Sequence, residues 1–327
     1  MQALVTGATG FVGSALVRSL LGRSVRVKAL VRSSSNLRNL AGLDVEMCLG
    51  DLLDEEALVR AMSGCEVVYH AAAMYSTREE DAPLLYNVNV GGTKAVMRAA
   101  VRAGIDRVVH TSTIGTIGQP EGSHLATEEQ PFDQWETASH YAKSKVLGEL
   151  AALRFCAKGI EIVVVNPCAP VGARDAGPSS TGLRILDHLR GKAPAFPSGG
   201  INFVAVEDVA DGHVLAAQLG RVGERYILGN AQGNLGLAGF QELMEKVSGI
   251  RPVSAPTGQA FLWRSLRAIW RGKVAGTEVR SVAKVTRRPP RLTCNPAKAI
   301  AELGLPQTPL QEAFARSVAW FRENGYV

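Results

Sequence analysis

The 327-residue sequence predicts an α/β fold, a doubly wound parallel sheet with a smaller C-terminal domain that is partly interleaved with it. Three observations lead to this prediction. Short apolar runs alternate with helical patterns through the first half of the chain. Three evenly spaced glycines follow the first apolar run. Beyond residue 165 the pattern becomes irregular, with joints that are rich in proline and glycine.

The alternating pattern defines the elements of the first half. Because strands that alternate with helices form βαβ units, we expect a parallel sheet covered by helices on both faces. We predict strands at residues 3–6, 25–31, 45–49, 67–70, 107–111 and 161–165. We predict helices at residues 12–21, 55–62, 84–103 and 140–157.

Composition narrows the class of protein. Apolar residues make up 46% of the chain and charged residues 20%, which favours a packed core over disorder. No stretch reaches the roughly 18–20 consecutive apolar residues of a membrane span, and the first strand leaves no room for a signal peptide. The five cysteines show no Cys-x-x-Cys pattern, and the six histidines show no metal-ligand spacing. We therefore expect a cytoplasmic protein with reduced thiols and no metal.

The net charge of +6 comes from one segment. Residues 251–291 hold ten Lys or Arg against one acid, whereas the rest of the chain holds 26 bases against 29 acids. This uneven distribution argues against a nucleic-acid partner. Within the segment, residues 260–271 form an amphipathic basic pattern. It fits a lid over an apolar substrate pocket, a helix on an anionic membrane surface, or a helix with a solvated basic face.

The glycines lie between the first predicted strand and the first predicted helix. Gly7 permits a tight turn, Gly10 lets a phosphate approach the backbone, and Gly13 lets the helix pack closely. The free amides and the dipole of the helix N-terminus then favour a pyrophosphate. These features predict a Rossmann dinucleotide-binding domain at residues 1–165, followed by a mainly substrate-binding domain at 166–327. The residues assigned here to the cofactor are Gly7, Thr9, Gly10, Phe11, Val12 and Gly13.

The end of the second strand indicates which dinucleotide binds. An NAD site usually carries an acid about 20 residues beyond the glycines, where this chain has Arg32. A guanidinium suits the 2′-phosphate of NADP(H), so we predict NADP(H), with NAD as the alternative. The competing interpretation of Arg32 is a solvated loop residue.

The ends of the third and fourth strands supply further cofactor contacts. Asp51, followed by Leu52, could accept a hydrogen bond from the adenine amine; the alternative is that Asp51 caps the next helix. The fourth strand ends in three small residues that leave space for a cofactor: Ala71, Ala72 and Ala73.

Tyr141 and Lys145 carry the predicted chemistry. They are four residues apart, so they share one face of a helix. A neighbouring ammonium stabilises a phenolate, and we expect Lys145 to lower the pKa of Tyr141. Upstream, strand alternation sends Thr111 and Thr113 to one face and Ser112 to the other. A hydroxyl there could hold a substrate carbonyl beside the phenol.

The glycines, the strand-end hydroxyls and Tyr-x-x-x-Lys, in this order, resemble an extended short-chain dehydrogenase/reductase, over nearly the whole chain. The stretches at residues 166–172, 206–213 and 303–309 further resemble hopanoid-associated sugar epimerases, which are similar to dihydroflavonol reductases. The resemblance makes Tyr141 the general acid/base and Lys145 the ligand of the nicotinamide ribose. Thr113, five residues before Gly118, takes the place of the family's usual serine, and Ser112 is its substitute if the register shifts by one.

The resemblance also assigns supporting residues. Pro167 lines the nicotinamide, and Thr111 joins the cofactor-binding set. Asn89 ties a helix to a loop near the site, or has a purely structural role.

Two features favour a carbonyl reductase over a nucleotide-sugar epimerase or dehydratase linked to hopanoid biosynthesis. One is Arg32. The other is that Ile201 and Asn202 stand where sugar-nucleotide enzymes of the family carry an Arg-Asp pair for the diphosphate. Arginines of the basic segment 251–291 could instead bind the diphosphate: Arg287, Arg288 or Arg291. A non-catalytic nucleotide sensor is the third hypothesis. We expect a small-molecule substrate of apolar character, and a homodimer is compatible with the sequence.

Overall fold

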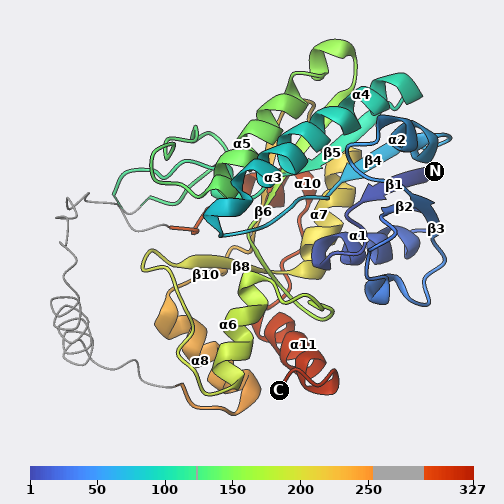
Figure 1. Cartoon of the computed structure of the whole chain (residues 1–327). Helices are drawn as coiled ribbons and strands as arrows, with labels where there is room; N and C mark the ends of the chain where they lie inside the picture. Colours follow the sequence, from blue (N-terminus) through green and yellow to red (C-terminus); the bar gives the residue numbers. More distant parts are fainter. Residues whose placement is uncertain (123, 253–290) are drawn as a thin grey trace, which may run out of the picture.

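The computed structural model describes residues 1–122, 124–252 and 291–327 (Figure 1). Its main sheet has seven strands in the order β3-β2-β1-β4-β5-β6-β9, all paired in parallel. The predicted fold class is therefore confirmed. The strands are β1 Gln2–Thr6, β2 Arg26–Val31, β3 Glu46–Leu49, β4 Val67–His70, β5 Arg107–Thr111, β6 Glu161–Pro167 and β9 Arg225–Leu228.

Helices cover both faces of this sheet (Figure 1). Successive residues of β1 show why: Ala3 and Val5 belong to the apolar core on the side of α1, whereas Leu4 belongs to the core on the side of α2 and α4. All three side chains are fully buried, as expected for a strand inside a parallel sheet. One face carries α1 Phe11–Leu21 and α7 Val206–Leu219; the other carries α2 Glu55–Met62, α4 Thr93–Ala103 and α5 His140–Leu153.

The smaller domain has its own sheet and core. Its three strands, in the order β10-β8-β7, are Asn234–Leu235, Ile201–Ala205 and Ala169–Val171. Three rings, those of Phe203, Phe240 and Phe314, lie with their centroids 5.3 to 5.9 Å apart at its centre. The helices of this part are α6 Ser180–Leu189, α8 Leu237–Ser248 and α11 Leu310–Glu323, while α10 Ala297–Leu303 contacts α7 and β9.

The long helix predicted at residues 84–103 is wrong in one respect. The segment is divided into α3 Ala82–Tyr86, a π-helical stretch η3 Asn87–Gly92, and α4. The interruption coincides with Asn89, whose side chain forms hydrogen bonds with the backbone of Met74. Helix α5 also approaches closely here, since a Cβ on its Gly148 would lie 2.6 Å from the Asn89 carbonyl oxygen. π-Helical turns of this kind often occur beside functional sites.

The remaining elements are short. Helix α5 ends at Leu153 and is followed by a separate turn, so the prediction of one helix to residue 157 is too long. The 3₁₀ turns are η1 Arg38–Leu40, η2 Glu79–Asp81, η4 Ile114–Thr116 and η5 Cys156–Lys158.

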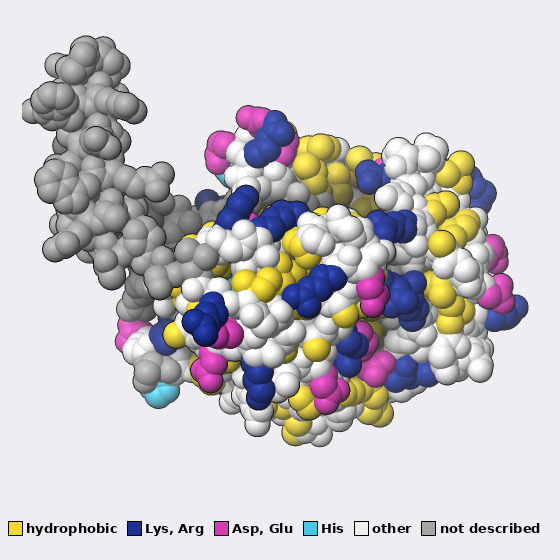
Figure 2. Space-filling model, turned by 90° about the horizontal axis from the view of Figure 1, so that it is seen from below, with side chains coloured by type: hydrophobic (Ala, Val, Ile, Leu, Met, Phe, Trp, Pro, Cys, Tyr) yellow, Lys and Arg dark blue, Asp and Glu magenta, His cyan; other side chains and the backbone are white. Residues whose placement is uncertain are grey.

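Outside the basic segment 251–291 the sequence has nearly equal numbers of bases and acids, and one face of the molecule shows this balance. On the face in Figure 2, Lys and Arg side chains alternate with Asp and Glu and do not form one continuous basic patch. Within the described ranges, every helix is too short or too polar to cross a membrane. The amphipathic segment 260–271, together with Arg287 and Arg288, lies outside the described residues.

Candidate active site

The glycine turn between β1 and α1 has the geometry that the sequence predicts. Gly7 has a φ of +73°, and a Cβ there would lie 2.6 Å from the amide nitrogen of Ala72. A Cβ on Gly13 would lie 2.1 Å from the Gly7 carbonyl oxygen. At Gly10 a Cβ would meet a single atom within 4 Å, the Gly7 carbonyl oxygen at 3.3 Å, so this position is less crowded than Gly7 and Gly13.

The first turn of α1 is free to bind an anion. Gly10 is the N-cap residue and supplies no side-chain hydrogen bond to the helix, and the first turn carries no acid. Phe11 and Val12 begin the helix, and the Thr9 carbonyl accepts a hydrogen bond from Asn39 at 3.1 Å. The N-terminal amides of the helix are therefore available for a phosphate.

The ends of β2 and β3 lie beside this turn in the sheet order. Arg32 is exposed, its amide donates to Ser35 Oγ at 3.0 Å, and no carboxylate of the described chain pairs with its guanidinium. Asp51 is exposed and accepts from the amide of Leu53 at 2.9 Å. The N-cap of α2 is Asp54, so the alternative role of Asp51 as a helix cap is wrong.

The end of β4 closes the same edge. The amide of Ala71 donates to the Thr6 carbonyl, and that of Ala72 donates to Thr6 Oγ1, each at 3.3 Å. Ala73 follows in an exposed position. Strands β1 and β4 flank the point where the strand order reverses, which is where ligands of doubly wound sheets bind.

Lys145 is held by the backbone of β5. Its ammonium is buried and donates to the Thr111 carbonyl at 2.6 Å. Burial lowers the pKa of Lys145 to about 8, and the carboxylate of Glu149 acts in the opposite direction.

Tyr141 corrects one prediction. Burial raises the pKa of its phenol to about 12, and the nearby Tyr75 adds to this rise; Lys145 does not lower it. The rings of Tyr75 and Tyr141 meet edge to face, with centroids 4.8 Å apart. The ammonium of Lys145 is engaged by the strand carbonyl, so the protein alone does not stabilise a phenolate.

The three hydroxyls after β5 have different surroundings. Thr111 Oγ1 bonds to His213 Nε2 at 2.9 Å, so the Thr111 hydroxyl is used within the fold. Ser112 is buried and donates to Glu149 at 2.6 Å. Thr113 is only half-buried, and its hydroxyl accepts from the Gly115 amide at 3.3 Å, which leaves its proton free to donate. Of these three hydroxyls, that of Thr113 is the one that does not contact another side chain in the described part of the chain, whereas the Ser112 hydroxyl is held by Glu149.

Glu149 is a buried residue that the sequence analysis missed. Its Oε2 accepts from Ser112 Oγ, from Thr116 Oγ1 at 3.0 Å and from Asn166 Nδ2 at 3.3 Å. Arg225 Nη1 lies 3.5 Å from its other oxygen. Because Glu149 follows Lys145 by one helical turn, the spacing alone could have indicated that both face the same strand ends.

The structure also places Asn89 and Pro167, the two supporting residues that the resemblance assigns. Asn89 donates to the Met74 carbonyl and to Ser144 Oγ, so it ties the π-helical stretch to the loop after β4 and to α5. Pro167 is the last residue of β6 and pairs with Leu228 of β9.

Ile201 and Asn202, the two positions that the sequence analysis used to favour a reductase over an epimerase, are buried. Ile201 belongs to the core of the smaller domain. Asn202 donates to the Asn230 carbonyl and to Asn234 Oδ1, each at 2.9 Å. Arg291 donates to the Gly122 carbonyl. Neither position 201 nor 202 presents a cation to a ligand.

Comparisons with known proteins identify the family. Residues 3–229 match the model of the NAD dependent epimerase/dehydratase family. The chain is 38% identical to a putative dihydroflavonol 4-reductase of Synechocystis sp., covering 99% of this chain and 95% of the relative. It is 35% identical to sterol demethylase protein B of Methylococcus capsulatus, over the full length of both. The crystal structure of gox2253 superposes with a TM-score of 0.86, at 35% identity and 99% coverage of each chain. The chain therefore belongs to the NAD dependent epimerase/dehydratase family and is, as the sequence predicts, an NAD(P)-dependent oxidoreductase of the extended short-chain dehydrogenase/reductase kind.

Proposed function

We propose that this protein is an NADP(H)-dependent reductase of an aldehyde or ketone, with Tyr141 as the general acid. The observation that carries the proposal is the state of Tyr141. Tyr141 is half-buried, and desolvation raises the pKa of its phenol to about 12, so the phenol keeps its proton at neutral pH, as the acid of a reduction must.

The residues at the carboxyl ends of the central strands fit a dinucleotide. The absence of a side chain at Gly10 and the uncapped first turn of α1 suit the pyrophosphate, and Lys145 would hold the nicotinamide ribose. When bound, the cofactor supplies the hydride. The phenol of Tyr141 then gives its proton to the carbonyl oxygen, while the free hydroxyl of Thr113 donates a hydrogen bond to the same developing alkoxide.

Arg32 supports NADP(H) over NAD(H). It is exposed at the end of β2 and has no acidic partner in the described chain, so it can bind the 2′-phosphate in a bidentate manner. Fluorescence titration of the unmodified protein should show tighter binding of NADPH than of NADH, and Arg32→Asp should abolish or reverse this preference. The exposed Arg154 on the far end of α5 provides the control, since Arg154→Asp changes the net charge equally. Equal affinity for both cofactors in the unmodified protein would refute the assignment.

The residue at position 201 and the relatives support an apolar carbonyl substrate. Ile201 offers no cation for a sugar diphosphate, and relatives of high coverage are named for a dihydroflavonol and for a sterol. We place the reaction in the cytoplasm, because all five cysteines are free thiols.

A panel assay separates this proposal from the sugar epimerase or dehydratase. Aldehydes and ketones of increasing apolar size should oxidise NADPH stoichiometrically, which is measured as a loss of absorbance. UDP- and dTDP-sugars should neither bind nor react. An isomerised or dehydrated sugar nucleotide, formed without net consumption of NADPH, would overturn the reductase assignment and favour the family's other activity.

A further inference from the structure

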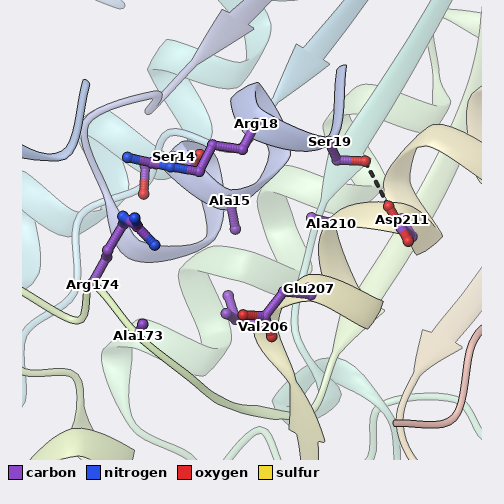
Figure 3. Close-up of a pocket in the computed structure, with 10 residues that line it drawn as sticks. All are labelled: Ser14, Ala15, Arg18, Ser19, Ala173, Arg174, Val206, Glu207, Ala210 and Asp211. Atoms are coloured by element: carbon purple, nitrogen blue, oxygen red, sulfur yellow. Dashed lines mark hydrogen bonds between the residues drawn. The ribbon is translucent and has the colours of Figure 1, made fainter. Parts of the chain in front are cut away.

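A hollow of about 260 Å³ lies between α1, α7 and the loop that follows β7 (Figure 3). Helices α1 and α7 cover the sheet face opposite α5, the helix that carries Tyr141 and Lys145 (Figure 1). None of the residues that we assign to the cofactor or to catalysis lines this hollow.

Two arginines converge at one end of the hollow. In Figure 3 the guanidinium groups of Arg18 and Arg174 lie side by side there. Arg18 is fixed by backbone carbonyls, because it donates to Ser14 at 2.9 Å and to Asn39 at 2.8 Å. Within the described ranges, neither arginine forms an ion pair. Partial burial lowers the pKa of Arg18, and the like charge of Arg174 acts in the same direction, which agrees with the two guanidiniums lying near each other.

The carboxylates near the hollow are already neutralised. Asp211 pairs with Arg23 at 3.0 Å and accepts from Ser19 at 2.6 Å. Glu207 pairs with Arg316 at 3.3 Å. These acids therefore do not balance the two guanidiniums at the other end.

The loop holds Arg174 in a costly conformation. Its φ is +74°, and in the described part of the chain only one other non-glycine residue, Ser24, has a positive φ. Such a conformation costs an ordinary side chain on the order of 1–3 kcal/mol and persists only where the surroundings enforce it. The next residue does so, since buried Asp175 accepts from the amide and the hydroxyl of Ser179 at 2.9 and 2.7 Å.

We propose that Arg18 and Arg174 bind the phosphate group of a phosphate monoester in this hollow, at a site separate from that of the cofactor. A guanidinium donates hydrogen bonds in a geometry that matches phosphate oxygens, and a phosphate dianion offsets the charge of two neighbouring arginines. The walls beside the pair include Ala15 and Ala173, whose small side chains leave room for the rest of the ligand. The proposal does not depend on the reductase activity.

Isothermal titration with inorganic phosphate and with glycerol phosphate, at constant ionic strength, tests the site. Arg174→Asn keeps the left-handed backbone, which asparagine tolerates, and removes the charge. We expect phosphate affinity to fall at least about tenfold in this variant and in Arg18→Gln, which is the loss of one charge-assisted contact. The matched control is Arg154→Asn, at the residue that caps the C-terminus of α5, and this variant should bind phosphate like the unmodified protein. The unfolding midpoint without phosphate shows whether each variant is folded.

Three results would overturn the proposal. One is unchanged phosphate affinity in folded Arg174→Asn. The second is displacement of phosphate by saturating NADPH, because it would place the anion in the cofactor site. The third is equal binding of glycerol phosphate and inorganic phosphate, because the hollow would then not recognise the organic part of a monoester. Tighter binding of glycerol phosphate than of inorganic phosphate would support an organic monoester as the ligand.

Discussion

The glycine turn after β1 and the hydroxyl loop after β5 lie at the same edge of the sheet but are built in opposite ways. The turn depends on side chains that are absent: a Cβ on Gly7 or Gly13 would collide with backbone. The hydroxyl loop depends on side chains that are present, because Ser112 and Thr116 bond to Glu149, which lies 37 and 33 residues further along the chain. Local sequence can specify the first region, whereas only the completed fold assembles the second.

Removal of the phenol hydroxyl should separate the two regions most sharply. Tyr141→Phe leaves the glycine turn untouched and deletes the proton donor. We expect turnover to fall by roughly 10²–10⁴, the usual loss for a general acid, while NADPH affinity stays nearly constant. Steady-state kinetics and fluorescence titration measure the two quantities. A variant that keeps more than about a tenth of its turnover would show that Tyr141 is not the acid.

Gly13→Ala should break the first region. The added Cβ would lie 2.1 Å from the Gly7 carbonyl oxygen, so the turn or the helix must shift. We expect a loss of about 3 kcal/mol or more in the free energy of unfolding, at the upper end for overpacking, together with weaker cofactor binding. Urea unfolding measures the first effect. Gly177→Ala is the control, because a Cβ at Gly177 meets no atom within 4 Å; equal stability of the two variants would contradict the steric argument.

Glu149→Gln should weaken the second region. Three donors share one carboxylate oxygen, and Arg225 faces the other, so an amide cannot serve both sides. We expect about 2 kcal/mol less stability, the worth of a hydrogen bond to a charged group. Glu149 also raises the pKa of Lys145. In Glu149→Gln this charge is lost, so Lys145 should lose its proton at a lower pH, and the alkaline limb of the activity profile should move to lower pH.

The exposed Glu245 on α8 provides the matched control. Glu245→Gln should change neither the stability nor the pH profile. If Glu149→Gln lowers stability but leaves the pH profile where it was, Glu149 supports the loop without tuning Lys145.

These differences explain what the sequence could predict. The fold class and the glycine turn follow from local patterns, since an alternating pattern and a residue without a side chain can both be recognised in isolation. Three other features depend on partners far away in the chain: the pairing of strand β9 with the sheet, the π-helical stretch at Asn89 and the role of Glu149. The predicted direction of the Tyr141 pKa shift was wrong for the same reason. Burial raises this pKa despite the nearby Lys145, and burial is a property of the whole fold.

Acid should weaken both regions through buried histidines. His70 bonds to Thr6 beside the glycine turn, and His213 bonds to Thr111 beside the hydroxyl loop. Burial lowers the pKa of His70 to about 3 and that of His213 to about 4, and it also lowers the pKa of His110. Below pH 6.5 the unfolded chain therefore binds protons that the folded chain excludes, so the free energy of unfolding falls as the pH falls.

Each histidine should contribute up to about 1.4 kcal/mol per pH unit below pH 6.5. Urea unfolding at pH 7.5 and pH 5.5 measures the total. Buried Glu128 and Asp175, whose carboxyl pKa values are raised, oppose the trend, so the difference between variants is more informative than the total. His70→Gln and His213→Gln should each remove one histidine's share of the pH dependence. Equal reductions would mean that the two regions share one cooperative unfolding event, whereas a dependence that neither substitution changes would show that these histidines are not the groups that titrate.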